Sequence, residues 1–248
     1  MRYFNLIKNI KNWWLYLSFK SGLAKREPLL FKARNGILIE VPLRLLHTFK
    51  EIWMEECYMH GSALKLSRLP VFIDIGANAG YFSLYAASRF PGAKILAYEP
   101  IPPNFEQLRR NININKNSRI IALQKAVAGY RGMAMMTFDK SDTFSTIAHI
   151  TNENGPDYKG DHIEVNCVTL QDIFDDNKLV SCDFLKMDCE GAESEIIFNC
   201  PVDYLSRIKQ FGIEMHGDAA PLKKYLRDNG FITHETKRSL GMLYAWKV

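Results

Sequence analysis

Residues 71–87 read Val71-Phe72-Ile73-Asp74-Ile75-Gly76-Ala77-Asn78-Ala79-Gly80-Tyr81-Phe82-Ser83-Leu84-Tyr85-Ala86-Ala87. The first five residues are mostly β-branched or aromatic, small residues follow, and the remainder repeats apolar side chains at helical spacing. This pattern predicts a strand, a tight loop and a helix. Gly76 and Gly80 lack a β-carbon, so the backbone can turn sharply there and a ligand can approach it closely. The loop leads into a helix N-terminus, which favours an electronegative ligand. An ordinary βα turn is the alternative.

A second apolar run, Lys94-Ile95-Leu96-Ala97-Tyr98, is followed by Glu99. An acid about 20 residues after a glycine loop is placed to accept both ribose hydroxyls of a nucleoside cofactor. The loop has the pattern G-x-x-x-G and lacks the middle glycine that makes room for a pyrophosphate in dinucleotide enzymes. Ala77 and Asn78 at that place suit a cofactor without phosphates, and S-adenosylmethionine fits. An NAD-dependent oxidoreductase and a non-catalytic nucleotide-binding or scaffold protein are the alternatives.

The composition is that of a globular chain. With 248 residues and 47% hydrophobic content, the chain can bury one large core, or a core and a small appendage. It has no apolar stretch of about twenty residues, so we expect no transmembrane helix. Its five cysteines are dispersed and form no C-x-x-C pair, which indicates a reducing compartment and a cytoplasmic protein.

The net charge of +5 is concentrated at the start of the chain. Residues 1–26 contain six lysines and arginines and no acid, so the remainder is nearly neutral and does not favour nucleic-acid binding. We expect this segment either to pack on the enzyme body or a partner subunit, or to lie as an aromatic and basic helix in a membrane interface. In the second case the protein is peripheral at the membrane. The sequence leaves the oligomeric state open. The aromatic residues of the segment are Tyr3, Phe4, Trp13, Trp14, Tyr16 and Phe19.

Three regions are expected: a basic aromatic segment at 1–28, an appendage at 29–69 and a main domain at 70–248. In the appendage, two strand-like runs flank Asn35-Gly36, a pair that favours the type I′ turn of a β-hairpin. From His47 to about Arg68 the pattern is helical. Within the main domain, residues 139–162 are polar and contain glycine and proline, which predicts a long insertion of the kind that often forms a substrate-facing lid.

Strands and helices alternate along the main domain, which predicts an α/β fold with a mostly parallel, Rossmann-like sheet covered on both faces. Ligands of such sheets bind outside the carboxyl ends of the strands. The glycine loop and several polar residues follow strand ends, so we expect them at one edge. Further strands are expected at 119–127, 133–138, 163–168, 182–187, 211–217, 231–236 and 243–248, with helices at 104–114, 170–174, 193–198 and 221–229. The residues expected at the shared edge are Glu99, Asp188, Glu190 and His216.

Three stretches resemble the FkbM family of S-adenosylmethionine-dependent methyltransferases. They are Phe72-Ile73-Asp74-Ile75-Gly76-Ala77-Asn78-Ala79-Gly80, Tyr98-Glu99-Pro100 with Asn104 and Leu108, and Leu185-Lys186-Met187-Asp188-Cys189-Glu190-Gly191-Ala192-Glu193. The first stretch marks methyltransferases in general, and the third is much more specific, although Met187 and Cys189 stand where aliphatic residues are usual. The resemblance implies the seven-strand methyltransferase sheet with its last strand antiparallel. It also implies O-methylation of a small-molecule or glycan acceptor, commonly a sugar hydroxyl in polysaccharide or glycolipid biosynthesis, or a natural product.

The resemblance also implies how the cofactor is held. The loop at 76–80 would hold the methionine tail and Glu99 the ribose, with Asp188 beside the methyl group. The full set of expected cofactor contacts is Asp74, Gly76, Ala77, Asn78, Gly80, Tyr81, Phe82, Glu99, Pro100, Asn104 and Asp188.

A sulfonium methyl group is already electrophilic, so the enzyme must mainly align the acceptor with the C–S bond and exclude water. An alcohol is a weak nucleophile while protonated, so a base or a metal ion should lie near it. Asp188, Glu190 and His216 are the catalytic candidates, with Asp188 or His216 as the base. A divalent ion such as Mg²⁺ is a further candidate, with Asp188, Glu214 and His216 as its ligands, because hard cations prefer carboxylate oxygens.

Structural roles are the alternatives for these residues. Asp188 could cap the following turn, Glu190 could serve a helix dipole, and His216 could be a hydrogen-bonded surface histidine. Tyr58 is expected in the core, as are Trp53 and Trp246.

Overall fold

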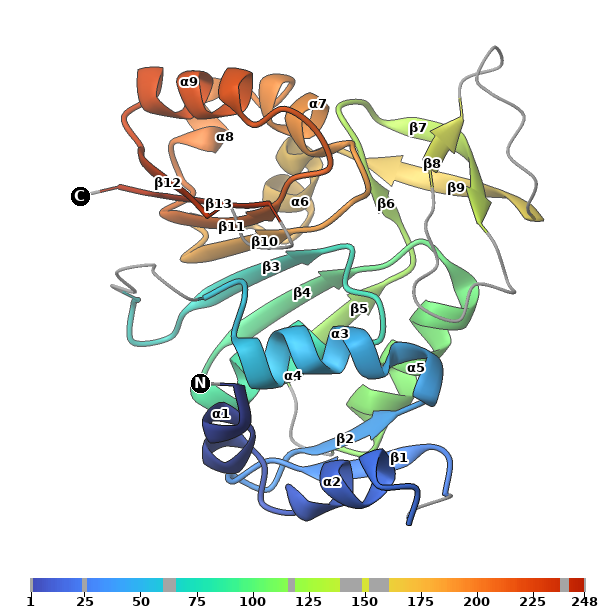
Figure 1. The fold of residues 1–248 in the computed structure, drawn as a ribbon. Helices are drawn as coiled ribbons and strands as arrows, with labels where there is room; N and C mark the ends of the chain where they lie inside the picture. The colour runs from blue at the N-terminus through green and yellow to red at the C-terminus, as the bar shows by residue number, and fades with distance from the viewer. Residues whose placement is uncertain are drawn as a thin grey trace.

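The computed structural model describes residues 2–23, 26–59, 66–115, 119–138, 149–151, 161–236 and 241–247. A seven-stranded sheet with the order β12-β13-β11-β10-β3-β4-β5 forms its centre (Figure 1). Within this sheet β13 runs antiparallel to both neighbours and the other pairs are parallel, which confirms the predicted fold class. The strands are β3 (Val71–Ile75), β4 (Lys94–Tyr98), β5 (Ile120–Leu123), β10 (Phe184–Met187), β11 (Gln210–Glu214), β12 (Ile232–Thr236) and β13 (Met242–Trp246).

Helices cover both faces of the sheet (Figure 1). Alternate strand residues enter two separate cores, because successive side chains point to opposite faces. Phe72 and Phe184 belong to the core under α4, and Ile73 and Leu185 to the core on the opposite face. Strands buried on both faces read as continuous apolar runs. The helices of the first face are α3 (Leu46–Lys50), α4 (Tyr81–Arg89) and α5 (Pro102–Asn113), and those of the second are α6 (Leu170–Asp176), α7 (Glu193–Phe198), α8 (Val202–Leu205) and α9 (Ala220–Asp228).

The strand order reverses at β3, which lies between β4 and β10. The chain proceeds from β3 outwards to β5 and later returns to the other side of β3 as β10. Ligands of open α/β sheets bind at such a reversal, outside the carboxyl ends of the strands. The fold therefore predicts a ligand site at the loops that follow β3, β4, β10 and β11.

The N-terminal part packs against the α4 face of the sheet. Leu6, Ile10, Phe31 and Trp53 are buried in the same core as Phe72. The elements of this part are α1 (Arg2–Asn9), α2 (Trp14–Lys20), β1 (Leu29–Lys32), β2 (Leu38–Val41), the 3₁₀-helix η1 (Leu43–Leu45), α3 and the π-helix η2 (Glu51–Glu55). None of the described helices is both long and apolar enough to cross a bilayer.

The predicted hairpin is confirmed, but its turn differs from the prediction. β1 and β2 pair antiparallel from Leu29↔Val41 to Lys32↔Leu38. A type I′ turn requires positive φ at both central residues, and of the pair Asn35-Gly36 only Gly36 has it, at 99°. The chain instead uses a longer loop in which the amide of Gly36 donates to the carbonyl of Ala33.

The continuous helical segment predicted from His47 to about Arg68 is wrong. The helix ends at Glu55, and Glu56 has left-handed geometry with φ of 54°, which stops the helical ladder. Residues 60–65 lie outside the described residues.

A second sheet has the order β6-β9-β7-β8. The predicted strand 119–127 is divided, because β5 pairs with β4 whereas β6 pairs with β9. Of the predicted insertion at 139–162, residues 139–148 and 152–160 lie outside the described residues, so the predicted lid stays a prediction. The strands of this sheet are β6 (Ala126–Val127), β7 (Gly132–Phe138), β8 (His149–Thr151) and β9 (Asp161–Val168).

Candidate active site

The glycine loop passes directly over the end of β10. Gly76 has a φ of 67°, and a β-carbon there would overlap the backbone carbonyl oxygen of Asp188. Gly80 is the N-cap residue of α4 with a φ of 79°, and a β-carbon there would overlap the side chain of Leu108. Only glycine meets both the left-handed geometry and the close approach. The loop is therefore fixed against β10 on one side and α5 on the other.

Glu99 follows β4 and holds the glycine loop. Its Oε2 accepts the amide of Asn78 at 2.8 Å, and its Oε1 accepts the amide of Ile101 at 2.9 Å. Burial raises the pKa of Glu99 to about 7 although both hydrogen bonds favour the ionised form. The loop and the acid that the sequence assigned to the cofactor are thus in direct contact.

The other residues assigned to the cofactor lie around this loop at different depths. Asp74 is fully buried beneath the loop, and its Oδ2 accepts the hydroxyl of Ser83 at 2.7 Å. Tyr81 and Phe82 are buried in the α4 core. Asn104 is buried and accepts Arg44 Nη1 at 3.2 Å. The remaining positions are Ala77, which is buried, and Pro100, which is half-buried.

Lys186 places a buried positive charge between the glycine loop and the strand-end acids. Its Nζ donates to the carbonyls of Ile75 and Gly76 at 3.1 and 2.5 Å. The same atom lies 3.5 Å from Asp74 Oδ1 and 3.5 Å from Asp188 Oδ2. Burial lowers the pKa of Lys186, but the charges of Asp188 and Asp74 outweigh that effect and keep the pKa above its ordinary value. A charged ammonium therefore ties β3 to β10.

Asp188 is hydrogen-bonded to a tyrosine that the sequence placed in the core. The hydroxyl of Tyr58 lies 2.9 Å from Asp188 Oδ2 and 2.7 Å from Glu214 Oε2, and its ring packs edge-on against Phe82. Tyr58 is buried, as expected, but its polar end faces the site. Burial and the charge of Asp188 raise the pKa of Glu214 to about 7. No local pattern marks Tyr58, because its partners lie 130 and 156 residues away in sequence.

His216 is oriented by a buried carboxylate. Its Nδ1 lies 2.9 Å from Glu193 Oε1, which also accepts the amides of Cys189 and Gly191. Its Nε2 lies 3.3 Å from Glu190 Oε2. The hydrogen bond with Glu193 and the nearby carboxylates raise the pKa of His216 to about 9, so it is an imidazolium at neutral pH.

Glu51 lies close enough to the site for the charges of Glu214 and Asp188 to act on it, and the sequence did not reveal it. It begins the π-helix η2, and its Oε1 lies 3.2 Å from Nδ1 of His47. Burial, followed by the charges of Glu214 and Asp188, raises the pKa of Glu51 to about 8. Single π turns inside helices are frequent at functional sites, but the sequence does not reveal them.

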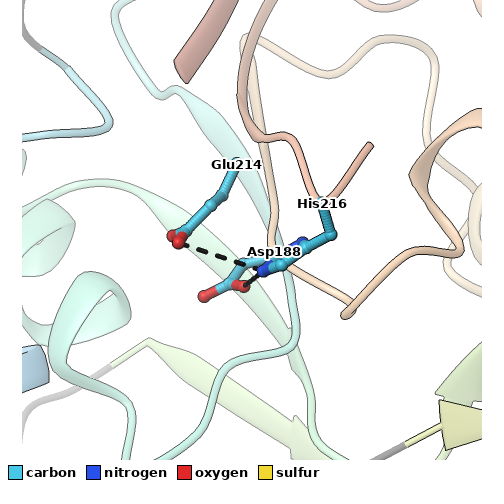
Figure 2. Close-up of side chains that lie close together, drawn as sticks. All are labelled: Asp188, Glu214 and His216. Carbon is cyan, nitrogen blue, oxygen red and sulfur yellow. Dashed lines mark ion pairs between the residues drawn. The ribbon is translucent and has the colours of Figure 1, made fainter. Parts of the chain in front are cut away.

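Asp188, Glu214 and His216 each present one ligand atom to a common space (Figure 2). These atoms lie within 4.8 Å of one another, with His216 Nε2 3.9 Å from Asp188 Oδ1 and 4.0 Å from Glu214 Oε1. Two carboxylates and an imidazole are an acceptable donor set for a divalent ion. The Nδ1 contact with Glu193 is the outer-shell arrangement that orients metal-bound histidines.

Comparisons with known proteins identify the family of this chain. The Methyltransferase FkbM domain matches residues 74–233. Methyltransferase sdnD of Sordaria araneosa is 28% identical over 211 residues, which cover 74% of this chain and 80% of that protein. The 31-O-demethyl-FK506 methyltransferase FkbM of Streptomyces tacrolimicus is 28% identical over 212 residues with the same coverage. The structure of methyltransferase FkbM from Methylobacillus flagellatus KT shares the fold, with a TM-score of 0.54 and 16% identity over 81% of this chain and 53% of that chain.

These matches are to methyltransferases, so they do not support the oxidoreductase alternative or the non-catalytic one. The family domain covers most of the sheet, from Asp74 at the end of β3 to Thr233 in β12. It includes the glycine loop, Glu99 and the acids that follow β10 and β11. The chain therefore belongs to the FkbM family of methyltransferases, whose methyl donor is S-adenosylmethionine.

Proposed function

We propose that this enzyme transfers the methyl group of S-adenosylmethionine to a hydroxyl oxygen of a small-molecule or glycan acceptor, with a sugar hydroxyl as the favoured class. The observation that carries the proposal is the position of Asp188, whose backbone touches the glycine loop while its carboxylate faces Tyr58 and Glu214. A carboxylate beside the cofactor loop can take a proton from an acceptor hydroxyl. The name of the Streptomyces relative, a 31-O-demethyl-FK506 methyltransferase, refers to methylation at an oxygen, which supports this chemistry.

Of the two candidate bases, Asp188 suits the role better than His216. With a pKa of about 9, His216 is protonated at neutral pH and has no free lone pair for a proton. In the proposed step the acceptor proton passes to the Asp188 carboxylate as the oxygen–methyl bond forms. The methyl–sulfur bond breaks at the same time, and its electron pair stays on sulfur to give S-adenosylhomocysteine. Lys186 and Tyr58 fix the carboxylate for this step.

Binding of a divalent ion is a further proposal, and the side chains at this site fit one. Asp188, Glu214 and His216 would hold it, and it would act as a Lewis acid on the acceptor oxygen. Binding would require His216 Nε2 to lose its proton, so affinity should increase with pH. Calorimetry with MgCl₂ and with MnCl₂, on wild type and on Glu214→Gln, tests the site directly. Absence of binding, with turnover unchanged by a chelator, would exclude the ion.

The experiment for the proposed function compares Asp188→Asn with Asp228→Asn. Asp228 pairs with Lys224 on the exposed side of α9 and serves as the matched control. Turnover is measured as S-adenosylhomocysteine release on a panel of sugars, glycolipids and hydroxylated natural products. We expect Asp188→Asn to bind S-adenosylmethionine and to lose at least about 100-fold in turnover, the usual contribution of a general base. Full turnover in this variant would refute the assignment of the base.

Binding of the donor is tested separately by calorimetry with S-adenosylmethionine and NAD. We expect S-adenosylmethionine to bind and NAD not to bind, because Ala77 and Asn78 occupy the place of the pyrophosphate-binding glycine. Turnover confined to acceptors without a sugar would refute the favoured acceptor class while leaving methyl transfer intact.

A further inference from the structure

We propose that the outer face of residues 2–23 and 26–30, here called the N-terminal face, docks this enzyme on an anionic lipid bilayer. The face consists of the exposed sides of α1, α2 and β1. Phe4 is 69% exposed, Trp14 55% and Leu23 81%. Large exposed patches of apolar side chains mark interaction sites on folded proteins. The large apolar residues exposed on this face are Tyr3, Phe4, Ile7, Trp14, Leu17, Leu23 and Leu30.

The N-terminal face is held in place by the body of the enzyme. The inner side of α1 buries Leu6, and the amides of Asn5 and Asn9 donate to backbone carbonyls at the end of η2, at 3.0 and 2.9 Å. On the outer side, Phe4 and Ile7 are three residues apart and lie on one side of the helix. The inner side of α1 is therefore already packed and hydrogen-bonded to the enzyme. Its exposed apolar residues are not needed to hold the helix in place.

The two helices present their outer residues side by side. Tyr3 of α1 lies 6.4 Å from the ring of Tyr16 in α2, and Lys20 Nζ in α2 lies 2.9 Å from the Tyr3 hydroxyl. Figure 1 shows α1, α2 and the β1–β2 hairpin together at the end of the molecule away from α9. Asn12, between the helices, donates to the carbonyl of Leu30 and joins β1 to the same surface.

The charge of the N-terminal face matches an anionic bilayer. Residues 1–30 carry six lysines and arginines and one acid, Glu27, whereas the rest of the chain is nearly neutral. Lys8, Lys11 and Lys20 are exposed among the apolar residues. Basic residues near a membrane are attracted to anionic headgroups, and Trp and Tyr rings prefer the level of those headgroups. A nucleic acid would use the cations but would leave aliphatic residues such as Leu17 in water.

Two double variants separate the apolar and the charged contributions. Phe4→Ser/Trp14→Ser removes exposed rings, and Lys11→Glu/Lys20→Glu reverses exposed charges. Val180→Ser/Val202→Ser is the matched control, because both valines lie outside the N-terminal face and are 87% and 57% exposed. Far-UV circular dichroism and thermal unfolding establish that each variant folds. None of these positions lies in the proposed active site, so calorimetry with S-adenosylmethionine should give wild-type affinity throughout.

The readout is cosedimentation of the full chain with vesicles. Vesicles of phosphatidylcholine with about one third phosphatidylglycerol are compared with pure phosphatidylcholine, at low and high salt. We expect wild type and the valine control to bind the anionic vesicles, and salt to weaken that binding. Each N-terminal variant should bind at least about tenfold more weakly. Trp14 should add a blue shift of fluorescence on binding that the Phe4→Ser/Trp14→Ser variant lacks.

Three outcomes would overturn the proposal. Wild type could stay in the supernatant with anionic vesicles, or the valine control could lose binding as strongly as the N-terminal variants. The third is self-association without vesicle binding: if sedimentation equilibrium shows an oligomer that Phe4→Ser/Trp14→Ser dissolves, the N-terminal face is an interface between copies of this chain. Because S-adenosylmethionine binding is measured on the same samples, failure of the docking proposal is distinguishable from failure of the proposed methyl transfer.

Discussion

Replacing Lys186 by methionine should remove the charge that ties β3 to β10. The ammonium lies 3.5 Å from Asp74 Oδ1 and 3.5 Å from Asp188 Oδ2. Coulomb's law gives about 5 kcal/mol for one such contact at an effective dielectric constant of about 20, before the desolvation of both charges is subtracted. Removing one partner of a buried pair costs about 3–5 kcal/mol because the other charge is left uncompensated. We expect the free energy of unfolding of Lys186→Met to fall by about this amount.

The loss in free energy of unfolding of Lys186→Met should increase with pH, because Asp74 is left without its cation. Burial already raises the pKa of Asp74 above its ordinary value of 3.8, and Lys186 opposes that rise. In the variant the folded state therefore holds the Asp74 proton more tightly than the unfolded chain does. Stability contributed by such a group is present below the unfolded pKa and falls as pH rises above it. Urea unfolding followed by circular dichroism, in acidic and in neutral buffer, measures this difference.

A double-mutant cycle with Asp74→Asn isolates the pair. Asp74→Asn removes the buried carboxylate at nearly constant volume, so the double variant should lose less stability than the sum of the single variants. Lys224→Met is the control, because its ion pair with Asp228 is exposed and should contribute less than about 1 kcal/mol. A loss for Lys186→Met as small as that of the control, with no dependence on pH, would refute the role of the ion pair.

Three further predictions concern the loop and the strand-end groups. Gly76→Ala should lower the thermal unfolding temperature far more than Gly191→Ala, because both have positive φ but only Gly76 faces backbone at close range; equal losses would contradict this. Tyr58→Phe keeps its packing on Phe82 but no longer donates to Glu214, so the Glu214 pKa should rise above about 7 and move the acidic limb of the pH–rate profile upwards. An unmoved profile would argue against a catalytic part for this bond. S-adenosylmethionine affinity should rise as pH increases through about 7, because the ribose contact predicted for Glu99 needs an ionised carboxylate as acceptor, and calorimetry on Glu99→Gln should show no such rise.

The sheet could be predicted because its strands are buried on both faces. Such strands appear as apolar runs between turn residues, so β3, β4 and β10 lie within about two residues of their expected bounds, whereas β11 ends at Glu214 and not at Gly217. The errors occur where tertiary contacts override local preference. The Asn35-Gly36 pair favours a two-residue turn, but pairing of Lys32 with Leu38 leaves a longer loop. The helical sequence pattern after His47 continues past Glu56. The residue types around Glu56 do not predict its left-handed conformation.

The site was predictable only where its residues follow strand ends. Glu99, Asp188 and His216 share one edge because parallel strands bring their carboxyl ends together. Tyr58 and Glu51 reach the same edge from the appendage, and nothing in their local sequence requires that approach. The pKa of His216, which its hydrogen bond with Glu193 and the nearby carboxylates raise to about 9 against the effect of burial, likewise depends on a carboxylate on another element. For this reason the sequence left both Asp188 and His216 as candidates for the base, and the choice of Asp188 is a proposal that rests on the raised pKa of His216.

The charges of the site match the charge change of the proposed reaction. Methyl transfer from a sulfonium to a hydroxyl removes one positive charge from the cofactor and releases one proton from the acceptor. Among the described residues at this edge, carboxylates outnumber the cations Lys186 and His216, and the pKa of Glu214 and of Glu51 lies at about 7 and about 8. In the proposed reaction this negative charge would favour the sulfonium before transfer, and the carboxylate of Asp188 would take the acceptor proton within the same group of acids. In that step the positive charge lost at sulfur and the negative charge lost at Asp188 would compensate each other, so the net charge of the site would stay constant.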